Sequence, residues 1–179
     1  MTLPVSGGLP EPTGPPAPRA EVFLGYLDYF RSVLVDKVQG LSDVDLRSSR
    51  LPSGWTPLAL LVHLTYVERR WLGWGFEGEP FAEPWGDSRD SRDSRDGRWY
   101  VGPQASLSSV VEALLAQGER PRAVVQSHEL SDVGRPGPRW DGAPPPALER
   151  VLFHLLQEYA RHAGHLDVVR ELVDGAVGE

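Results

Sequence analysis

Apolar residues recur every three to four positions along four separate stretches of the chain, which is the period of an amphipathic α-helix. These stretches predict helices over residues 19–39, about 57–76, about 106–127 and about 147–173. Gly40 and Gly175 are stop signals for the first and last helices, and a Ser or Thr cap before Pro57 marks the start of the second. No stretch shows the clean alternation of a half-buried strand. The pattern predicts an all-α four-helix bundle.

The helices are separated by stretches rich in proline and glycine, which break regular structure. Residues 1–18 predict a disordered tail, because such a composition cannot bury enough apolar area to offset the entropy of ordering. The triplet Ser-Arg-Asp occurs three times over 88–96, inside a predicted low-complexity surface loop at about 78–105. Residues 19–175 are expected to form one domain. Pro121 is expected to kink or divide the third helix.

The charge balance and the lack of cysteine exclude several classes of function. The chain has 18 Lys+Arg against 25 Asp+Glu, a formal net charge of −7, which argues against nucleic acid or an anionic membrane as the main partner. Without cysteine there is no disulfide, no Cys-ligated metal and no cysteine nucleophile. The sequence shows neither a membrane-spanning apolar run nor a secretory signal, so the expected location is the cytoplasm.

The second predicted helix has one histidine beside its apolar face. On a helical wheel His63 lies at the edge of an arc formed by Leu60, Leu64, Val67, Trp71 and Trp74. The same wheel turns Glu68, Arg69 and Arg70 to the flank or to the opposite side. The tryptophans are expected to be core and loop-anchoring residues: Trp55, Trp71, Trp74, Trp85, Trp99 and Trp140.

The fourth predicted helix has polar residues where its core face should be. Its apolar face is defined by Leu148, Val151, Leu155, Leu166, Val169, Leu172 and Val173. Glu158 and His162 fall in the middle of that face, with His154 and His165 toward one side. A carboxylate and an imidazole four residues apart in an apolar stripe must be paired, hydrogen-bonded or metal-bound, because an isolated buried charge is very costly.

Three interpretations of this pair remain open at the level of spacing. Glu158 and His162 could form a buried structural pair. They could hold a metal ion together with His63 from a facing helix, which leaves open positions as in catalytic zinc sites. They could act in acid–base catalysis without a metal, with His162 oriented by Glu158. The sequence lacks the Glu-x-x-His pair of di-iron bundles, the His-Glu-x-x-His of zincins, and the nucleophile elbow and nucleotide-binding loops of other enzymes.

Several segments resemble the DinB-like superfamily. They are Ser53-Gly54-Trp55-Thr56-Pro57, His63-Leu64, Glu68-Arg69-Arg70-Trp71 and Glu158-Tyr-Ala-Arg-His162-Ala-Gly-His165-Leu-Asp167. They look closest to the branch that includes mycothiol-dependent maleylpyruvate isomerase. The resemblance implies an up-down-down-up bundle with a long crossover between helices 2 and 3, and a divalent metal held by His63, Glu158 and His162.

His165 and Asp167 also match the pattern of this branch, whereas His154 and Arg70 are placed near the ligands by their positions on the helices. His165 would lie behind the ligands or serve as an alternative ligand. His154 would form part of a pocket wall, and Asp167 would have a structural or surface role. Arg70 would contact an anionic substrate or extend its charged end to water.

The activity implied by the resemblance is a metal-dependent thiol transferase or isomerase of unknown acceptor. A small-molecule thiol, with mycothiol as one candidate, would react with an electrophile, since a metal-bound thiol is readily deprotonated. Zinc is the expected metal, although imidazole and carboxylate ligands also suit nickel, iron and manganese. The alternatives are a non-catalytic metal-binding bundle in stress response or interaction, and a purely structural bundle. A homodimer is compatible with each of these functions.

Overall fold

The computed structural model describes residues 9–88 and 99–178, so residues 1–8 of the predicted tail, and Arg89, Arg92 and Arg95 of the repeat, lie outside the described residues. Residues 9–18 have no regular structure, and two hydrogen bonds join them to side chains of the first helix. The Leu9 amide donates to Ser32 Oγ at 3.1 Å, and the Tyr26 hydroxyl donates to Glu11 at 3.3 Å.

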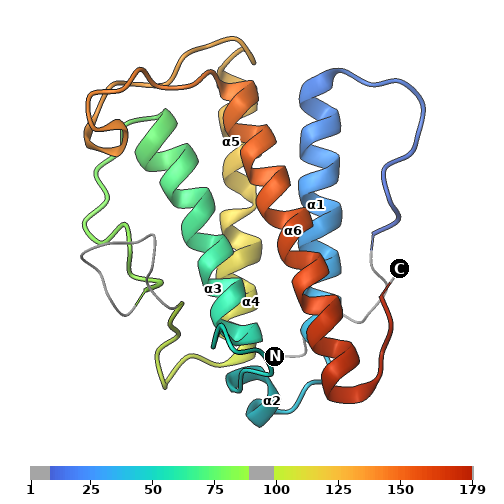
Figure 1. The fold of residues 1–179 in the computed structure, drawn as a ribbon. Helices are drawn as coiled ribbons and strands as arrows, with labels where there is room; N and C mark the ends of the chain where they lie inside the picture. The colour runs from blue at the N-terminus through green and yellow to red at the C-terminus, as the bar shows by residue number, and fades with distance from the viewer. Residues whose placement is uncertain (1–8, 89–98, 179) are drawn as a thin grey trace.

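The all-α prediction is confirmed, because the described residues form helices and two isolated β-bridges but no strand (Figure 1). The elements are α1 (Arg19–Val38), α2 (Asp43–Arg47), α3 (Pro57–Glu68), a π-helix η1 (Arg69–Phe76), α4 (Leu107–Gln117), α5 (Glu119–Ser127), a 3₁₀-helix η2 (Pro138–Trp140) and α6 (Leu148–Asp174). No helix among the described residues is both long and apolar enough to cross a membrane.

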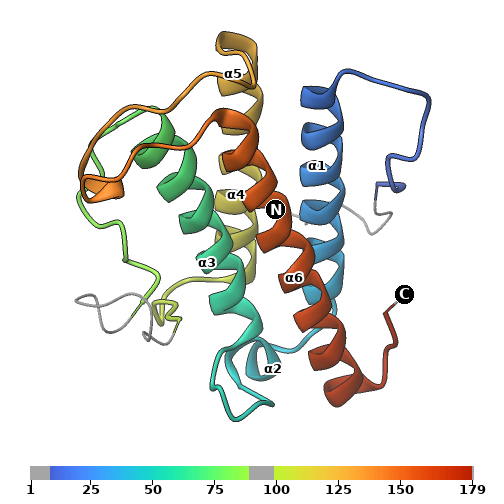
Figure 2. The same ribbon diagram turned by 45° about the horizontal axis from the view of Figure 1, so that its top comes forward.

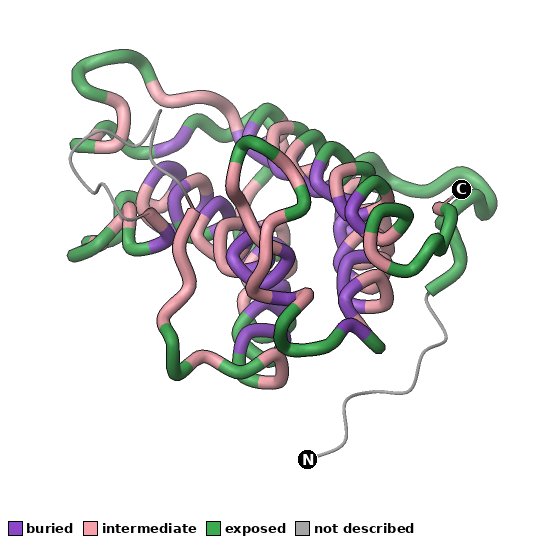
Figure 3. The backbone as a smooth tube through the Cα atoms, turned by 60° about the horizontal axis from the view of Figure 1, so that its bottom comes forward, coloured by how far each residue is buried: buried purple, intermediate pink, exposed green. Residues whose placement is uncertain are grey.

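The long helices lie side by side, with α6 packed against α1 and α3, and α3 packed against α4 (Figures 1 and 2). In both views α1 and α6 run in one direction, and α3 and α4 run in the other. The chain therefore has to return along the molecule between η1 and α4. Figure 3 shows that the buried residues gather along the inner sides of the helices, where α3 is buried on nearly all sides.

The predicted second helix is present, but its last turns are π-helical. Thr56 caps α3 by accepting from the Ala59 amide at 3.3 Å, with Pro57 at the first helical position. After Glu68 the backbone widens into η1, which ends with the Glu77 amide donating to the Leu72 carbonyl five residues earlier. Such π-helical turns are rare and are frequently found at functional sites.

The predicted third helix divides at Gly118, three residues before Pro121. Proline lacks an amide hydrogen and its ring clashes with the carbonyl four residues earlier, which here belongs to Gln117, the last residue of α4. Pro121 is therefore accommodated in the first turn of α5. Gly118 is also needed sterically, because a Cβ there would lie 2.6 Å from the guanidinium carbon of Arg31.

The predicted core face of α6 is shifted. Tyr159, completely buried, occupies the place given to Glu158, which lies at the edge of the face with 23% of its side chain exposed. Leu172, predicted in the face, is exposed. The shift arises because α6 contacts two helices, α1 and α3, so its buried surface is wider than one stripe.

Glu68 is buried rather than directed to the flank, which corrects the wheel prediction. Its carboxylate accepts from Arg31 of α1 and from the Tyr159 hydroxyl at 2.8 Å. The helical wheel assumed that the second helix faces solvent along one side, whereas α3 packs against α1, α4 and α6. These three residues form a buried polar contact between α1, α3 and α6.

Candidate metal centre

The structure brings His63 of α3 together with Glu158 and His162 of α6. One donor atom from each of the three lies within 4.8 Å of the other two. His162 Nε2 is 3.1 Å from Glu158 Oε2, and His63 Nε2 is 4.0 Å from the same oxygen. The pair on α6 is one helical turn apart and points the same way, so helix geometry alone sets part of the cluster.

His63 is held by a carboxylate behind it. Its Nδ1 lies 2.9 Å from Asp87 Oδ2, and Asp87 is gripped by Arg70 at 2.7 and 3.0 Å. Arg70 also donates to the Pro84 carbonyl at 2.9 Å. These three hydrogen bonds all join Arg70 to the connection that follows η1.

This arrangement fixes the tautomer of His63. Burial raises the pKa of Asp87, but hydrogen bonds from His63 and Arg70 outweigh it and lower the pKa, so the carboxylate is ionised and can only accept. His63 must then carry its hydrogen on Nδ1 and present an Nε2 lone pair to the cluster. Burial lowers the pKa of His63 despite the opposing effect of Asp87, which favours the neutral imidazole that binds metals.

An indole ring covers one face of His63. Trp99 stacks on the imidazole with ring centroids 4.1 Å apart. The rings of Trp99 and His162 meet edge to face, with centroids 4.9 Å apart. Ser88 and Trp99 are paired in an antiparallel β-bridge, which brings both sides of the connection to His63. Packing and the Asp87 hydrogen bond together restrict rotation of the His63 side chain.

His162 has a partner on each ring nitrogen. Its Nε2 faces Glu158, and its Nδ1 lies 3.1 Å from Nδ1 of His165. Burial is the main cause of a lowered pKa at His165, which keeps that ring neutral and able to accept a hydrogen bond. In the tautomer that frees Nε2 for a metal, His162 would donate from Nδ1 to His165.

Glu158 is ionised and partly open to solvent. Burial raises its pKa, but hydrogen bonds from His154 and His162 outweigh this and lower the pKa well below its ordinary value. His154 Nε2 lies 3.2 Å from Glu158 Oε1, and its side chain is 32% exposed. The His154 ring lies against Trp71, with centroids 3.8 Å apart. His154 and Trp71 therefore border the open side of the cluster.

The donor set suits a divalent cation. Two neutral imidazoles and one carboxylate are typical ligands of catalytic zinc, where metal–nitrogen bonds of about 2.0–2.1 Å place tetrahedral ligands roughly 3.3 Å apart. The two donor separations of 3.1 and 4.0 Å bracket that value. The hydrogen bonds to Asp87 and His165 supply the outer partners that metal-binding histidines usually have.

Two neighbours of the cluster were not predicted from the sequence. Asp87 lies just before the Ser-Arg-Asp repeat, where a carboxylate is easily read as part of a solvated run, and Trp99 was expected to be a loop anchor. Arg70 was expected to contact substrate or to extend its charged end to water, and the structure contradicts the second expectation, because Arg70 is buried against Asp87. One feature of the sequence did indicate that Arg70 lies near His63: the two residues are two helical turns apart on one side of the helix.

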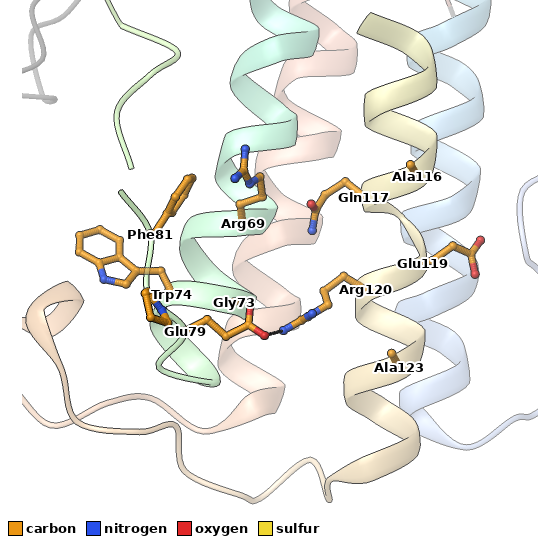
Figure 4. A pocket seen from close by; sticks show the side chains of 11 residues that line it. Arg69, Gly73, Trp74, Glu79, Phe81, Ala116, Gln117, Glu119, Arg120 and Ala123 are labelled. Carbon is orange, nitrogen blue, oxygen red and sulfur yellow. Dashed lines mark hydrogen bonds and ion pairs between the residues drawn. The ribbon is translucent and has the colours of Figure 1, made fainter. Parts of the chain in front are cut away.

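A separate pocket of about 380 Å³ lies between η1 and α5 and contains none of the candidate ligands (Figure 4). Trp74 and Phe81 line one side of it, and Gln117 lines the other. An ion pair between Arg120 and Glu79 crosses it. The candidate metal ligands lie instead between α3 and α6.

One family model matches most of the chain. The family model described as Mycothiol-S-transferase matches residues 22–175, a range that includes all three candidate ligands and their supporting residues. No curated protein matches the chain.

Proposed function

Because this chain belongs to the mycothiol-S-transferase family, we propose that it joins the sulfur of mycothiol to a small electrophilic acceptor at a divalent-metal centre held by His63, Glu158 and His162. The observation that supports this most strongly is the convergence of the three donor atoms, with Asp87 behind one histidine and His165 behind another. The chain has no cysteine, so the reacting sulfur must come from a cosubstrate.

The three candidate ligands would hold a divalent ion, with zinc the best match to the donor set, which would supply a thiolate by lowering the pKa of the cosubstrate thiol. The chain's own residues prepare this chemistry. Asp87 keeps the hydrogen of His63 on Nδ1, and His165 can do the same for His162. Trp99 covers one face of His63 and so shields that side of the cluster.

The proton of the thiol needs an acceptor near the open side. His154 meets this need, because it donates from Nε2 to the ionised Glu158, which leaves Nδ1 as the nitrogen that can accept a proton, and its side chain reaches solvent. Transfer then forms a sulfur–carbon bond to the acceptor, while the displaced group leaves with its electron pair or an unsaturated acceptor takes up a proton. His154 would pass the thiol proton to solvent or to that acceptor.

The proposal is tested by metal analysis and turnover on the same preparations. Untagged protein, purified without chelator or nickel resin, should hold close to one divalent ion per chain. His63→Ala, Glu158→Gln and His162→Ala should each lose the ion. His128→Ala is the matched control, since His128 contacts the Val124 carbonyl far from the cluster and should keep the metal.

Turnover is measured as metal-dependent consumption of mycothiol by a panel of electrophiles. The metal-loaded protein should react above the uncatalysed rate, and the three ligand variants should not. Stoichiometric metal without turnover across the panel would support the non-catalytic alternative. No metal after zinc, nickel and manganese have been offered would refute the proposal.

A further inference from the structure

Arg139 is a partly buried cation without an acidic partner among the described residues. Its Nε is buried and makes no hydrogen bond, and no carboxylate in the described part of the chain forms an ion pair with it. Burial and the nearby charge of Arg70 both lower the pKa of Arg139, which means that both disfavour its charged form. Partial desolvation of the cation, with a buried Nε that makes no hydrogen bond, is a cost that a bound anion would offset.

The surroundings of Arg139 are aromatic. Its guanidinium carbon lies 4.8 Å from the Trp71 ring centroid, 5.0 Å from Trp140 and 5.9 Å from Trp74. Contact with ring faces stabilises a guanidinium to a degree but leaves its hydrogen-bond donors unused. A hydrogen bond holds the Trp140 ring beside Arg139, because the indole donates to the Gly75 carbonyl at 3.1 Å.

Trp71 connects this cation to the candidate metal centre. One side of Trp71 contacts Arg139, and its ring also contacts His154, which is hydrogen-bonded to Glu158. Arg139 therefore lies beyond the indole that borders the open side of the cluster. Arg70, the other cation nearby, is already bound to Asp87 and cannot fill the same role.

We propose that Arg139 recognises an anionic group, such as a carboxylate, on the electrophilic acceptor and so directs the reactive carbon of that acceptor toward the metal centre. This inference rests on the proposed function and names the substrate class of the same site. A guanidinium suits this task because its fork of donors matches a carboxylate in a bidentate contact.

Two matched electrophiles test the inference. 4-(Iodoacetamido)benzoate and N-phenyliodoacetamide share the same ring and the same reactive carbon, and they differ in one remote carboxylate. With mycothiol, the sulfur bonds to the CH₂ carbon, the carbon–iodine bond breaks, iodide leaves with the bonding pair, and the thiol proton passes to solvent. Intrinsic reactivity is therefore nearly the same for both.

The metal-loaded protein is expected to show a higher kcat/KM for the benzoate, on the order of ten- to a hundredfold, as for a hydrogen bond to a charged group. Arg139→Gln should remove this preference by raising KM for the benzoate, with the neutral electrophile, the KM for mycothiol and the metal content unchanged. Arg139→Lys should retain part of it. Arg135→Gln is the matched control, because it removes an exposed charge from the segment between α5 and α6 that also holds Arg139. This variant should behave as the parent protein.

The inference is overturned if the parent protein shows no preference, or if Arg139→Gln slows both electrophiles equally. A binding measurement separates this outcome from failure of the proposed function. Calorimetry with unreactive 4-acetamidobenzoate and acetanilide needs no turnover. Binding of the benzoate that is lost in Arg139→Gln supports the inference even if neither electrophile reacts, whereas equal binding of the two compounds overturns it.

Discussion

Asp87→Asn is the sharpest test of how the candidate centre is organised. Asparagine keeps an oxygen that can accept from His63 Nδ1, but it removes the negative charge that fixes the His63 tautomer and neutralises Arg70. Mutation of such outer partners typically lowers metal affinity by about 10- to 100-fold. At about 1.4 kcal/mol per factor of ten, that is a loss of roughly 1.4 to 2.8 kcal/mol in binding free energy.

The same change should also destabilise the fold. Arg70 has 5% of its side chain exposed, and loss of one partner from a buried ion pair costs about 3–5 kcal/mol. Because Arg70 keeps its hydrogen bond to the Pro84 carbonyl, the lower end of that range is expected. The two effects are separable, since the double variant Arg70→Met, Asp87→Asn removes the unpaired cation and should recover stability but not metal affinity.

Metal affinity is measured by zinc competition with a chromophoric chelator, and stability by urea unfolding of the metal-free proteins. Asp174→Asn, which alters an exposed carboxylate paired with Arg170, is the control and should change neither quantity much. A zinc affinity for Asp87→Asn within twofold of the parent protein would refute the argument that Asp87 orients His63.

Three further predictions concern the fold around the site. Glu68→Gln should lower the free energy of unfolding by about 3 kcal/mol, because Arg31 would lose a buried charged partner; a urea-unfolding change below about 1 kcal/mol would contradict the buried-pair reasoning. Chelation of the metal should lower Tm by about 5–10 °C if the ion is present at about 100 times its Kd, and an unchanged Tm in calorimetry would count against a bound ion. Gly75→Ala should cost about 1–3 kcal/mol, because its Cβ would lie 2.8 Å from the Trp140 ring; a variant as stable as the parent in urea would show that η1 can shift freely.

The sequence predicted the features that depend on one helix at a time. The pairing of Glu158 with His162 follows from their spacing, and the caps at Thr56 and Gly175 follow from local backbone chemistry. The lengths of the first and last helices were also predicted to within a residue or so at most ends. These features need no knowledge of neighbouring helices, which is why periodicity and capping rules suffice for them.

Features that depend on packing were not predicted. Glu68 is buried because α1 and α6 both reach it, and a helical wheel for one helix contains no information about such neighbours. The π-helical turns of η1 depend on contacts with residues far along the chain, such as Trp140 against Gly75. Asp87 reaches His63 from an irregular segment 24 residues away, where no period indicates which side chain points inward.

The β-bridge between Ser88 and Trp99 lies at the boundary between the Ser-Arg-Asp repeat and the residues that contact His63. It pairs the two residues on either side of the 89–98 stretch, and both residues that contact His63, Asp87 and Trp99, lie outside that stretch. Because the cost of closing a loop grows only slowly with its length, Ser-Arg-Asp units could be gained or lost there with little effect on the two residues that flank His63. Variation in copy number between lineages would then be close to neutral for catalysis, leaving the repeat free to drift or to be recruited for another purpose.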